Sequence, residues 1–105
     1  MEIYKDKLIQ KISNKDIVIG VIGLGYVGLP LALGFIEQSF KIIGFDIDKN
    51  KNLSLNKGQS YIESIPSKLI NNAIKKDFLA TDDFSKTKEC DALIICVPTP
   101  LNKYR

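Results

Sequence analysis

Three glycines have the spacing in this chain that most strongly suggests chemistry. Gly23, Gly25 and Gly28 lie in the stretch GLGYVG, which follows the pattern G-x-G-x-x-G. In such a loop the first glycine permits a sharp turn, and the second lets a pyrophosphate lie against backbone N–H groups. The third lets a helix pack closely on a strand, and the helix N-terminus attracts the phosphates. Taken alone, the motif is equally compatible with a tight turn that binds nothing.

Asp46 favours the phosphate-binding alternative. It follows Gly28 at close to the spacing of about 20 residues at which a carboxylate binds the ribose hydroxyls of a dinucleotide. Such a carboxylate repels a 2′-phosphate, so the sequence predicts NAD rather than NADP. Lys49 and Lys51 leave open a pairing with a phosphate. Another possible role for Asp46 is to cap the next helix, although Asp48 is better placed for that.

Alternating strands and helices must position these residues. Continuous apolar runs predict buried strands over 16–23, 41–48, 78–80 and 90–100, and amphipathic patterns predict helices over 26–38, from 48 to 58 and after Pro66. This alternation predicts an α/β fold with a Rossmann-type parallel sheet of strand order 3-2-1-4. The elements make up most of the first half of a doubly wound domain, so we expect that domain to be incomplete.

Two finer predictions concern the helices. Residues 1–14 are expected to form an extra N-terminal helix, because Tyr4, Leu8 and Ile12 recur at four-residue spacing, and 15–105 to form the NAD-binding domain. In the helix over 26–38, the residues expected to face inward are Val27, Leu31, Phe35 and Ile36.

A Pro-Thr-Pro turn follows the fourth predicted strand. Ligands of open α/β sheets bind beyond the carboxyl ends of the strands, where the strand order reverses. With the order 3-2-1-4 this point lies between the first and fourth strands, so we expect Thr99 beside the glycine loop and near the nicotinamide half of the cofactor. A rigid turn that merely ends the strand is the alternative.

No residue suggests a catalytic nucleophile or a metal site. The chain has no histidine, and its cysteines, Cys90 and Cys96, make neither a metal-ligand set nor a disulfide framework. Cys96 lies within an apolar strand and is expected to be an ordinary core thiol. We therefore predict no catalytic residues and no metal.

Composition excludes several other classes. The 105 residues carry a net charge of +3 from 15 basic and 12 acidic side chains, without a basic block, which argues against nucleic-acid binding. No apolar run approaches the roughly 20 residues that span a bilayer, and the N-terminus does not resemble a signal peptide. We therefore expect a cytoplasmic protein without a membrane role.

Several motifs together resemble one family. The runs GLGYVGLPLA, GFDID, LNKGQSYI, IPS and CVPTPLN closely resemble the N-terminal NAD-binding domain of the UDP-glucose/GDP-mannose dehydrogenase family. The run PTPLNKYR is most similar to the branch that oxidises UDP-N-acetylhexosamines, including UDP-N-acetylglucosamine 6-dehydrogenases of surface-polysaccharide pathways. The resemblance extends from about Lys11 to Arg105.

The resemblance implies a cofactor and a site. The cofactor is NAD, with Asp46 on the adenosine ribose and Lys51 at the adenosine end. The reaction implied is oxidation of the C6 alcohol of a UDP-sugar to a carboxylate, through a thioester on a cysteine. The remaining contacts implied are the loop residues Gly23, Leu24, Gly25, Tyr26, Val27 and Gly28 around the pyrophosphate, and Val97, Pro98 and Thr99 near the nicotinamide ribose.

Length is where the chain departs from this family. Family members are much longer, and the nucleophilic cysteine and the sugar-binding domain belong to segments that this sequence lacks. We therefore expect the parent protein to be the enzyme and this chain alone to be inactive, with an exposed fourth strand that promotes self-association. The alternatives are a stand-alone NAD-binding or interaction module and the N-terminal domain of a hydroxyisobutyrate- or phosphogluconate-type dehydrogenase.

Overall fold

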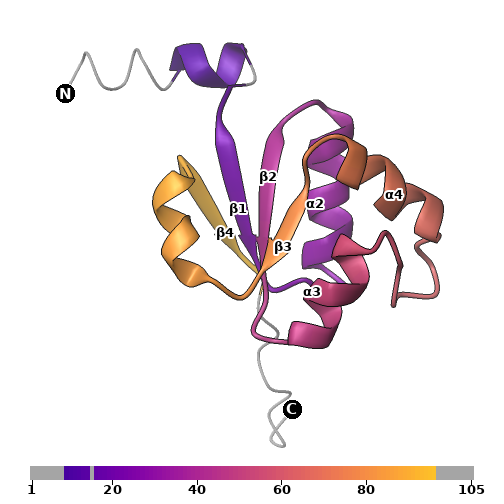
Figure 1. Cartoon of the computed structure of the whole chain (residues 1–105). Coiled ribbons are helices and arrows are strands. Elements are labelled where there is room, and N and C mark those ends of the chain that lie inside the picture. The colour runs from indigo at the N-terminus through magenta and orange to yellow at the C-terminus, as the bar shows by residue number, and fades with distance from the viewer. Residues whose placement is uncertain (1–8, 15, 97–105) are drawn as a thin grey trace, which may run out of the picture.

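The computed structural model describes residues 9–14 and 16–96 and shows a four-stranded parallel sheet of strand order β3-β2-β1-β4 (Figure 1). This confirms the predicted α/β class and the strand order 3-2-1-4. The strands are β1 (Val18–Ile22), β2 (Lys41–Phe45), β3 (Leu79–Thr81) and β4 (Ala92–Ile95). The helices are α2 (Gly28–Glu37), α3 (Lys49–Asn56), α4 (Ser67–Lys75) and the 3₁₀ helix η1 (Phe84–Glu89).

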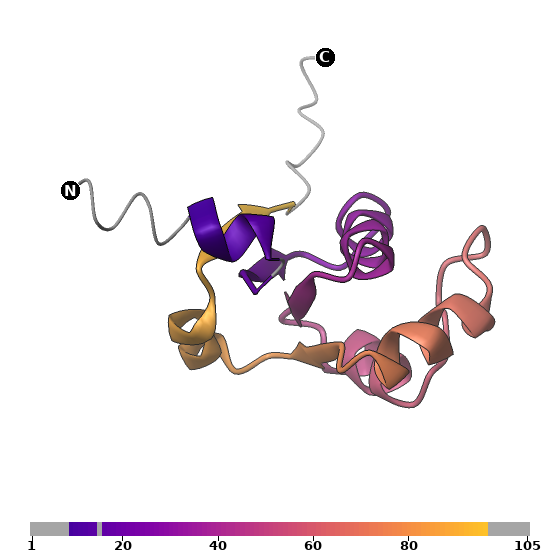
Figure 2. The same ribbon diagram turned by 90° about the horizontal axis from the view of Figure 1, so that it is seen from above.

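The two faces of the sheet are covered differently. Figure 2 shows α2, α3 and α4 on one side of the sheet and η1 on the other. Successive strand residues point to opposite faces, so Ile19 and Val21 of β1 enter the main core beneath α2. On the other face, the buried ring of Phe45 stacks on Phe84 of η1, with ring centroids 5.6 Å apart.

The strand register aligns the carboxyl ends of the strands. Ile22, the last residue of β1, pairs with Phe45 of β2 and with Ile95 of β4, and Phe45 in turn pairs with Thr81 of β3. The residues that follow these strands therefore emerge at one edge, at the bottom of Figure 1. Gly23 and Asp46 become neighbours for this reason.

The inward face of α2 differs from the prediction. Ile36 is buried as expected, but Val27 is 67% exposed and Leu31 is 37% exposed. The close contact between the start of the helix and β1 fixes its rotation, so the positions in register with Gly28 face the sheet. The residues actually buried are Gly28, Leu29, Ala32, Leu33 and Ile36.

Element boundaries shift by a few residues. The second strand ends at Phe45 rather than at residue 48, and the third begins one residue later than predicted. Residues 9–13 of the predicted N-terminal helix are helical, and residues 1–8 lie outside the described part of the chain. No helix in that described part has the length and apolarity that crossing a membrane requires.

Candidate cofactor-binding site

The glycine loop begins with a turn that leaves β1. Gly23 has φ of +96°, in the left-handed region that glycine adopts without steric cost. Its N–H donates to the carbonyl oxygen of Phe45 at 2.7 Å, which ties the loop to β2. A Cβ on Gly28 would lie 1.6 Å from the carbonyl oxygen of Gly23. Gly28 therefore permits the close approach of α2 to the end of β1, as the motif predicts.

Gly25 is a glycine for a different reason. Apart from its chain neighbours, no atom of the described residues would lie within 4 Å of a Cβ built on it, so the packing of those residues does not require glycine here. The space beside Gly25 is open, and a side chain would project into it. A pyrophosphate pressed against the backbone needs such a space. The loop therefore fits the diphosphate of a dinucleotide.

The N-terminus of α2 is open to an anion. Its N-cap residue, Val27, provides no side-chain hydrogen bond, and the first turn contains no acidic residue among the described positions. Tyr26 and Val27, which precede this helix, are 82% and 67% exposed. The N–H of Leu29 already donates to the carbonyl oxygen of Gly25 at 3.1 Å, and Pro30 has no N–H. A phosphate at this end would therefore meet the N–H groups that precede Leu29, together with the partial positive charge of the helix.

Asp46 lies directly after β2 and is oriented by the backbone. Its Oδ2 accepts the N–H of Leu24 at 2.8 Å, and its Oδ1 accepts the N–H of Asp48 at 2.9 Å. No lysine in the described part of the chain forms an ion pair with it. Because each carboxylate oxygen has two lone pairs, Asp46 retains acceptor capacity for the hydroxyls of a ribose.

The alternative role of Asp46 as a helix cap is wrong. Asp48 caps α3, since its Oδ1 accepts from the N–H groups of Asn50 at 2.9 Å and Lys51 at 3.3 Å. Asp46 instead joins the turn to the glycine loop. Its own carbonyl oxygen accepts the side-chain amide of Asn52 at 2.9 Å, which fixes the turn between β2 and α3.

Tyr61 is a residue of this site that sequence reasoning missed. Its hydroxyl donates to the carbonyl oxygen of Leu24, inside the glycine loop. Burial, and then the charges of Asp46 and Asp48, raise the pKa of Tyr61 above its usual value. The only signal available was its place in the run LNKGQSYI, which contributed to the family resemblance but indicated no role for the side chain.

The predicted loop residues therefore serve the site in different ways. The side chain of Leu24 is fully buried in the core, and its N–H is bonded to Asp46, so that N–H is not available to a phosphate. Lys51 is brought beside Tyr61, with its Nζ 5.7 Å from the ring centroid. The predicted contacts Val97, Pro98 and Thr99 lie outside the described residues.

Neither cysteine has the surroundings of an activated nucleophile. Cys96 follows β4 directly, donates its N–H to the carbonyl oxygen of Ile22 at 2.7 Å, and packs against the core. Burial, followed by the charges of Glu89 and Asp91, raises the pKa of the Cys90 thiol. Both cysteines are free thiols. The described residues contain no group of three or more potential metal ligands.

Fold and site together define a Rossmann-type dinucleotide-binding domain. Residues 17–105 match the NAD binding domain of the UDP-glucose/GDP-mannose dehydrogenase family, and the chain belongs to this family. The cofactor of this domain is NAD. The predicted family and cofactor are thus confirmed.

Curated relatives come from the branch that the sequence suggested. The UDP-N-acetyl-D-glucosamine 6-dehydrogenase of Salmonella typhi is 40% identical over 90 residues, which cover 86% of this chain and 20% of that protein. The UDP-N-acetyl-D-mannosamine dehydrogenase of Methanococcus aeolicus is 41% identical over 96 residues, 90% of this chain and 21% of that protein. The chain spans about a fifth of the length of these relatives.

Solved structures share the fold. A ternary complex of GDP-mannose dehydrogenase from Pseudomonas aeruginosa matches with a TM-score of 0.76 and 32% identity, over 82% of this chain and 20% of that one. A UDP-D-ManNAc dehydrogenase from Pyrococcus horikoshii matches with a TM-score of 0.75 and 32% identity, over 82% and 21% of the two chains. This confirms the Rossmann-type architecture.

Proposed function

We propose that the glycine loop and Asp46 hold the pyrophosphate and the adenosine ribose of NAD. The observation that carries this proposal is the open space beside Gly25, which lies next to an uncapped helix N-terminus and to the oriented carboxylate of Asp46. Within the loop Gly23 to Gly28, the N–H groups of Gly23 and Leu24 are already bonded to Phe45 and Asp46, so residues 25–28 supply N–H groups to the pyrophosphate while Gly23 and Gly28 permit the turn and the close packing. Lys51 is proposed to lie near the adenosine end of the cofactor. Val97, Pro98 and Thr99, which lie outside the described residues, are the proposed contacts of the nicotinamide ribose.

The relatives support a proposal for the substrate of the whole protein. Those named above act, by their names, on UDP-N-acetyl-D-glucosamine and UDP-N-acetyl-D-mannosamine. We infer that the parent protein is an NAD-dependent dehydrogenase that oxidises C6 of a UDP-N-acetylhexosamine in the cytoplasm, as a step toward surface polysaccharide. The free thiols Cys90 and Cys96 agree with a reducing compartment.

The chain by itself supplies cofactor binding without turnover. Its described residues offer no cysteine whose surroundings favour a thiolate, and the chain contains no histidine to act as a general base. We therefore propose that the 105 residues bind NAD and do not oxidise a UDP-sugar. A stand-alone NAD-binding module remains the second candidate, and turnover of UDP-N-acetylhexosamines by the longer parent protein would decide against it.

Calorimetric titration with NAD⁺ and NADP⁺ tests the cofactor site. We expect NAD⁺ to bind more tightly than NADP⁺, and Asp46→Asn to weaken NAD⁺ binding about tenfold to a hundredfold, because a charge-assisted hydrogen bond is worth roughly 1.5–3 kcal/mol. Asp77→Asn is a matched control: it removes the same charge at a position with φ of +66°, which asparagine tolerates, at the opposite edge of the sheet. Preference for NADP⁺, or equal effects of the two variants, contradicts the role of Asp46.

Edge strand β4 is the proposed surface of self-association. It pairs only with β1 in the described sheet, and Leu93 and Ile95 on its open face are 46% and 68% exposed. Unpaired strand edges with apolar side chains invite pairing with another chain. Sedimentation should show concentration-dependent association that Ile95→Lys reduces, and a strictly monomeric wild-type chain would count against it.

A further inference from the structure

Tyr61 belongs to the irregular segment 59–66, which connects α3 to α4 and reaches the glycine loop. Its hydroxyl donates to the carbonyl oxygen of Leu24, while the N–H of Leu24 donates to Asp46 at 2.8 Å. Both polar backbone groups of Leu24 are thus held by side chains from outside the loop. The buried side chain of Leu24 completes the anchoring, since it packs over Gly44 of β2.

The orientation of Leu24 determines that of the next N–H. None of the described peptide bonds is cis. In a planar trans peptide the C=O of one residue and the N–H of the next point in opposite directions. The bond from Tyr61 to the carbonyl of Leu24 therefore turns the N–H of Gly25 away from segment 59–66. Gly25 is the residue beside the open space.

Segment 59–66 is built to hold Tyr61 in place. The hydroxyl of Ser60 donates to the carbonyl of Ile62 at 3.0 Å and accepts its N–H at 3.1 Å, and the N–H of Ser60 donates to the hydroxyl of Ser67 at 3.0 Å. Ile62 and Ile65 anchor the segment in the core. A tyrosine phenol is protonated at neutral pH even with its ordinary pKa of about 10, and burial raises the pKa of Tyr61 further, so its hydroxyl is a hydrogen-bond donor.

We propose that Tyr61 is a positioning residue of the cofactor site, whose hydroxyl orients the N–H of Gly25 toward the pyrophosphate. This inference rests on the proposed function of the glycine loop and extends the site to a segment outside the glycine motif. Tyr61 acts through the peptide between Leu24 and Gly25, so its effect falls on binding of the phosphates and spares binding of the adenosine ribose by Asp46.

Tyr61→Phe tests the proposal because it removes one hydroxyl and keeps the ring. We expect affinity for NAD⁺ and ADP to fall about five- to tenfold, the worth of roughly one hydrogen bond, and affinity for adenosine to change less than twofold. Titrations followed by NMR give all three affinities. In the protein without ligand, the amide resonance of Gly25 should shift between wild type and variant, because its peptide is no longer held.

Thr87→Val is the control variant. It also removes one hydroxyl that donates to a backbone carbonyl, that of Phe84 at 2.8 Å, but in η1 on the other face of the sheet. It should therefore lower the melting temperature without changing the ratio of ADP to adenosine affinity. Equal weakening of ADP and adenosine by Tyr61→Phe, or an unchanged Gly25 resonance, overturns the proposal. A wild-type chain that binds neither NAD⁺ nor ADP contradicts the proposed function instead. In that case the Gly25 amide resonance of the two proteins without ligand still tests whether Tyr61 orients the peptide between Leu24 and Gly25.

Discussion

An aspartate side chain accepts a backbone N–H at each end of β1, but the two aspartates have different roles. The carboxyl edge below is the edge of the sheet where the strands end, and the amino edge is the one where they begin. At the carboxyl edge, Asp46 accepts the N–H of Leu24, just after β1. At the amino edge, Asp91 accepts the N–H of Val18, the first residue of β1, at 2.9 Å. Each carboxylate thus fastens one end of the central strand to a neighbouring strand.

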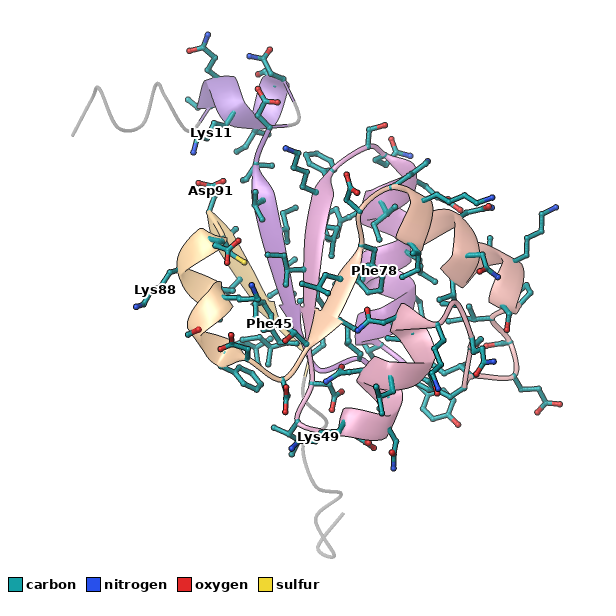
Figure 3. All side chains as sticks on the ribbon, in the orientation of Figure 1. Lys11, Phe45, Lys49, Phe78, Lys88 and Asp91 are labelled. Carbon is teal, nitrogen blue, oxygen red and sulfur yellow. The ribbon has the colours of Figure 1, made fainter. Side chains whose placement is uncertain are left out.

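The difference lies in the second partner of each carboxylate. Asp91 also binds the ammonium of Lys11 at 3.0 Å, and Figure 3 shows these side chains facing each other across the amino edge. The Val18 hydrogen bond, and then Lys11, hold the pKa of Asp91 below its usual value. Asp46 binds only backbone N–H groups within the described chain, which leaves it an acceptor for a ligand. A carboxylate already neutralised by a lysine serves stability, and one without such a partner is suited to binding.

The largest expected effect is the loss of stability caused by a substitution at the carboxyl edge of the sheet. Gly28→Ala should destabilise the protein by about 3 kcal/mol or more, because the added Cβ would overlap the carbonyl oxygen of Gly23 and force α2 away from β1. Gly34→Ala, on the exposed side of the same helix, should instead increase the free energy of unfolding by about 0.5–1 kcal/mol. Chemical denaturation followed by circular dichroism measures both. Similar stabilities of the two variants would contradict the role of Gly28.

Gly25→Ala separates binding from stability at the same edge. Its Cβ meets no atom of the described residues within 4 Å apart from its chain neighbours, so the melting temperature should change little. Affinity for NAD⁺ should fall about tenfold or more, because the methyl group occupies the space of the pyrophosphate and removes close hydrogen bonds. Calorimetry and thermal unfolding of one preparation check both parts. An unaltered affinity would mean that the phosphates lie elsewhere.

The amino edge should respond to acid. Since folding lowers the pKa of Asp91, its charge stabilises the protein above the pKa of the unfolded chain, and this contribution disappears as the pH falls through the folded value. Asp91→Asn should therefore lower the melting temperature by a few degrees at pH 7 and by almost nothing near pH 2. Melting curves from pH 2 to 7 test this, and a pH-independent difference would refute it.

The smallest expected effect is the loss of the ion pair between Lys11 and Asp91. Lys11→Gln should destabilise the protein by less than about 1 kcal/mol, because the pair is partly exposed and the bond from Val18 persists. The difference from wild type should vanish near 1 M salt, where the Debye length is about 3 Å. Denaturation at low and high salt measures it. NAD⁺ affinity should not change in this variant, in contrast to Asp46→Asn.

Much of the fold and the centre of the site were predictable because they depend on short-range patterns. The glycine spacing, the acid after the second strand and the Asp48 cap are local signals, and apolar runs bounded by polar residues indicate buried strands. The alternation of strands and helices indicated a parallel sheet, and the strand order came from the doubly wound fold that these elements match. These features required no knowledge of how distant segments pack.

The rest depends on tertiary contacts. Tyr61 meets Leu24 across 37 residues, from a segment without regular structure, so no periodicity could indicate the pair. The rotation of α2 follows from the contact of Gly28 with β1, and hydrophobic spacing alone selected a neighbouring face that included Val27 and Leu31. The contacts proposed for Val97 to Thr99 stay predictions.

The hydrogen bonds of Asp46 and Asp91 to β1 close loops of different length in the chain. The bond between Leu24 and Asp46 joins residues 22 positions apart, whereas the bond between Val18 and Asp91 joins residues 73 positions apart. Closing the longer loop costs about 1 kcal/mol more in chain entropy. During N-to-C synthesis the residues up to Tyr61 also emerge before β4 exists. The residues proposed for the adenosine and pyrophosphate half of the site therefore lie in one contiguous stretch, and we expect the hydrogen bond between Val18 and Asp91 to form after that half of the site has assembled.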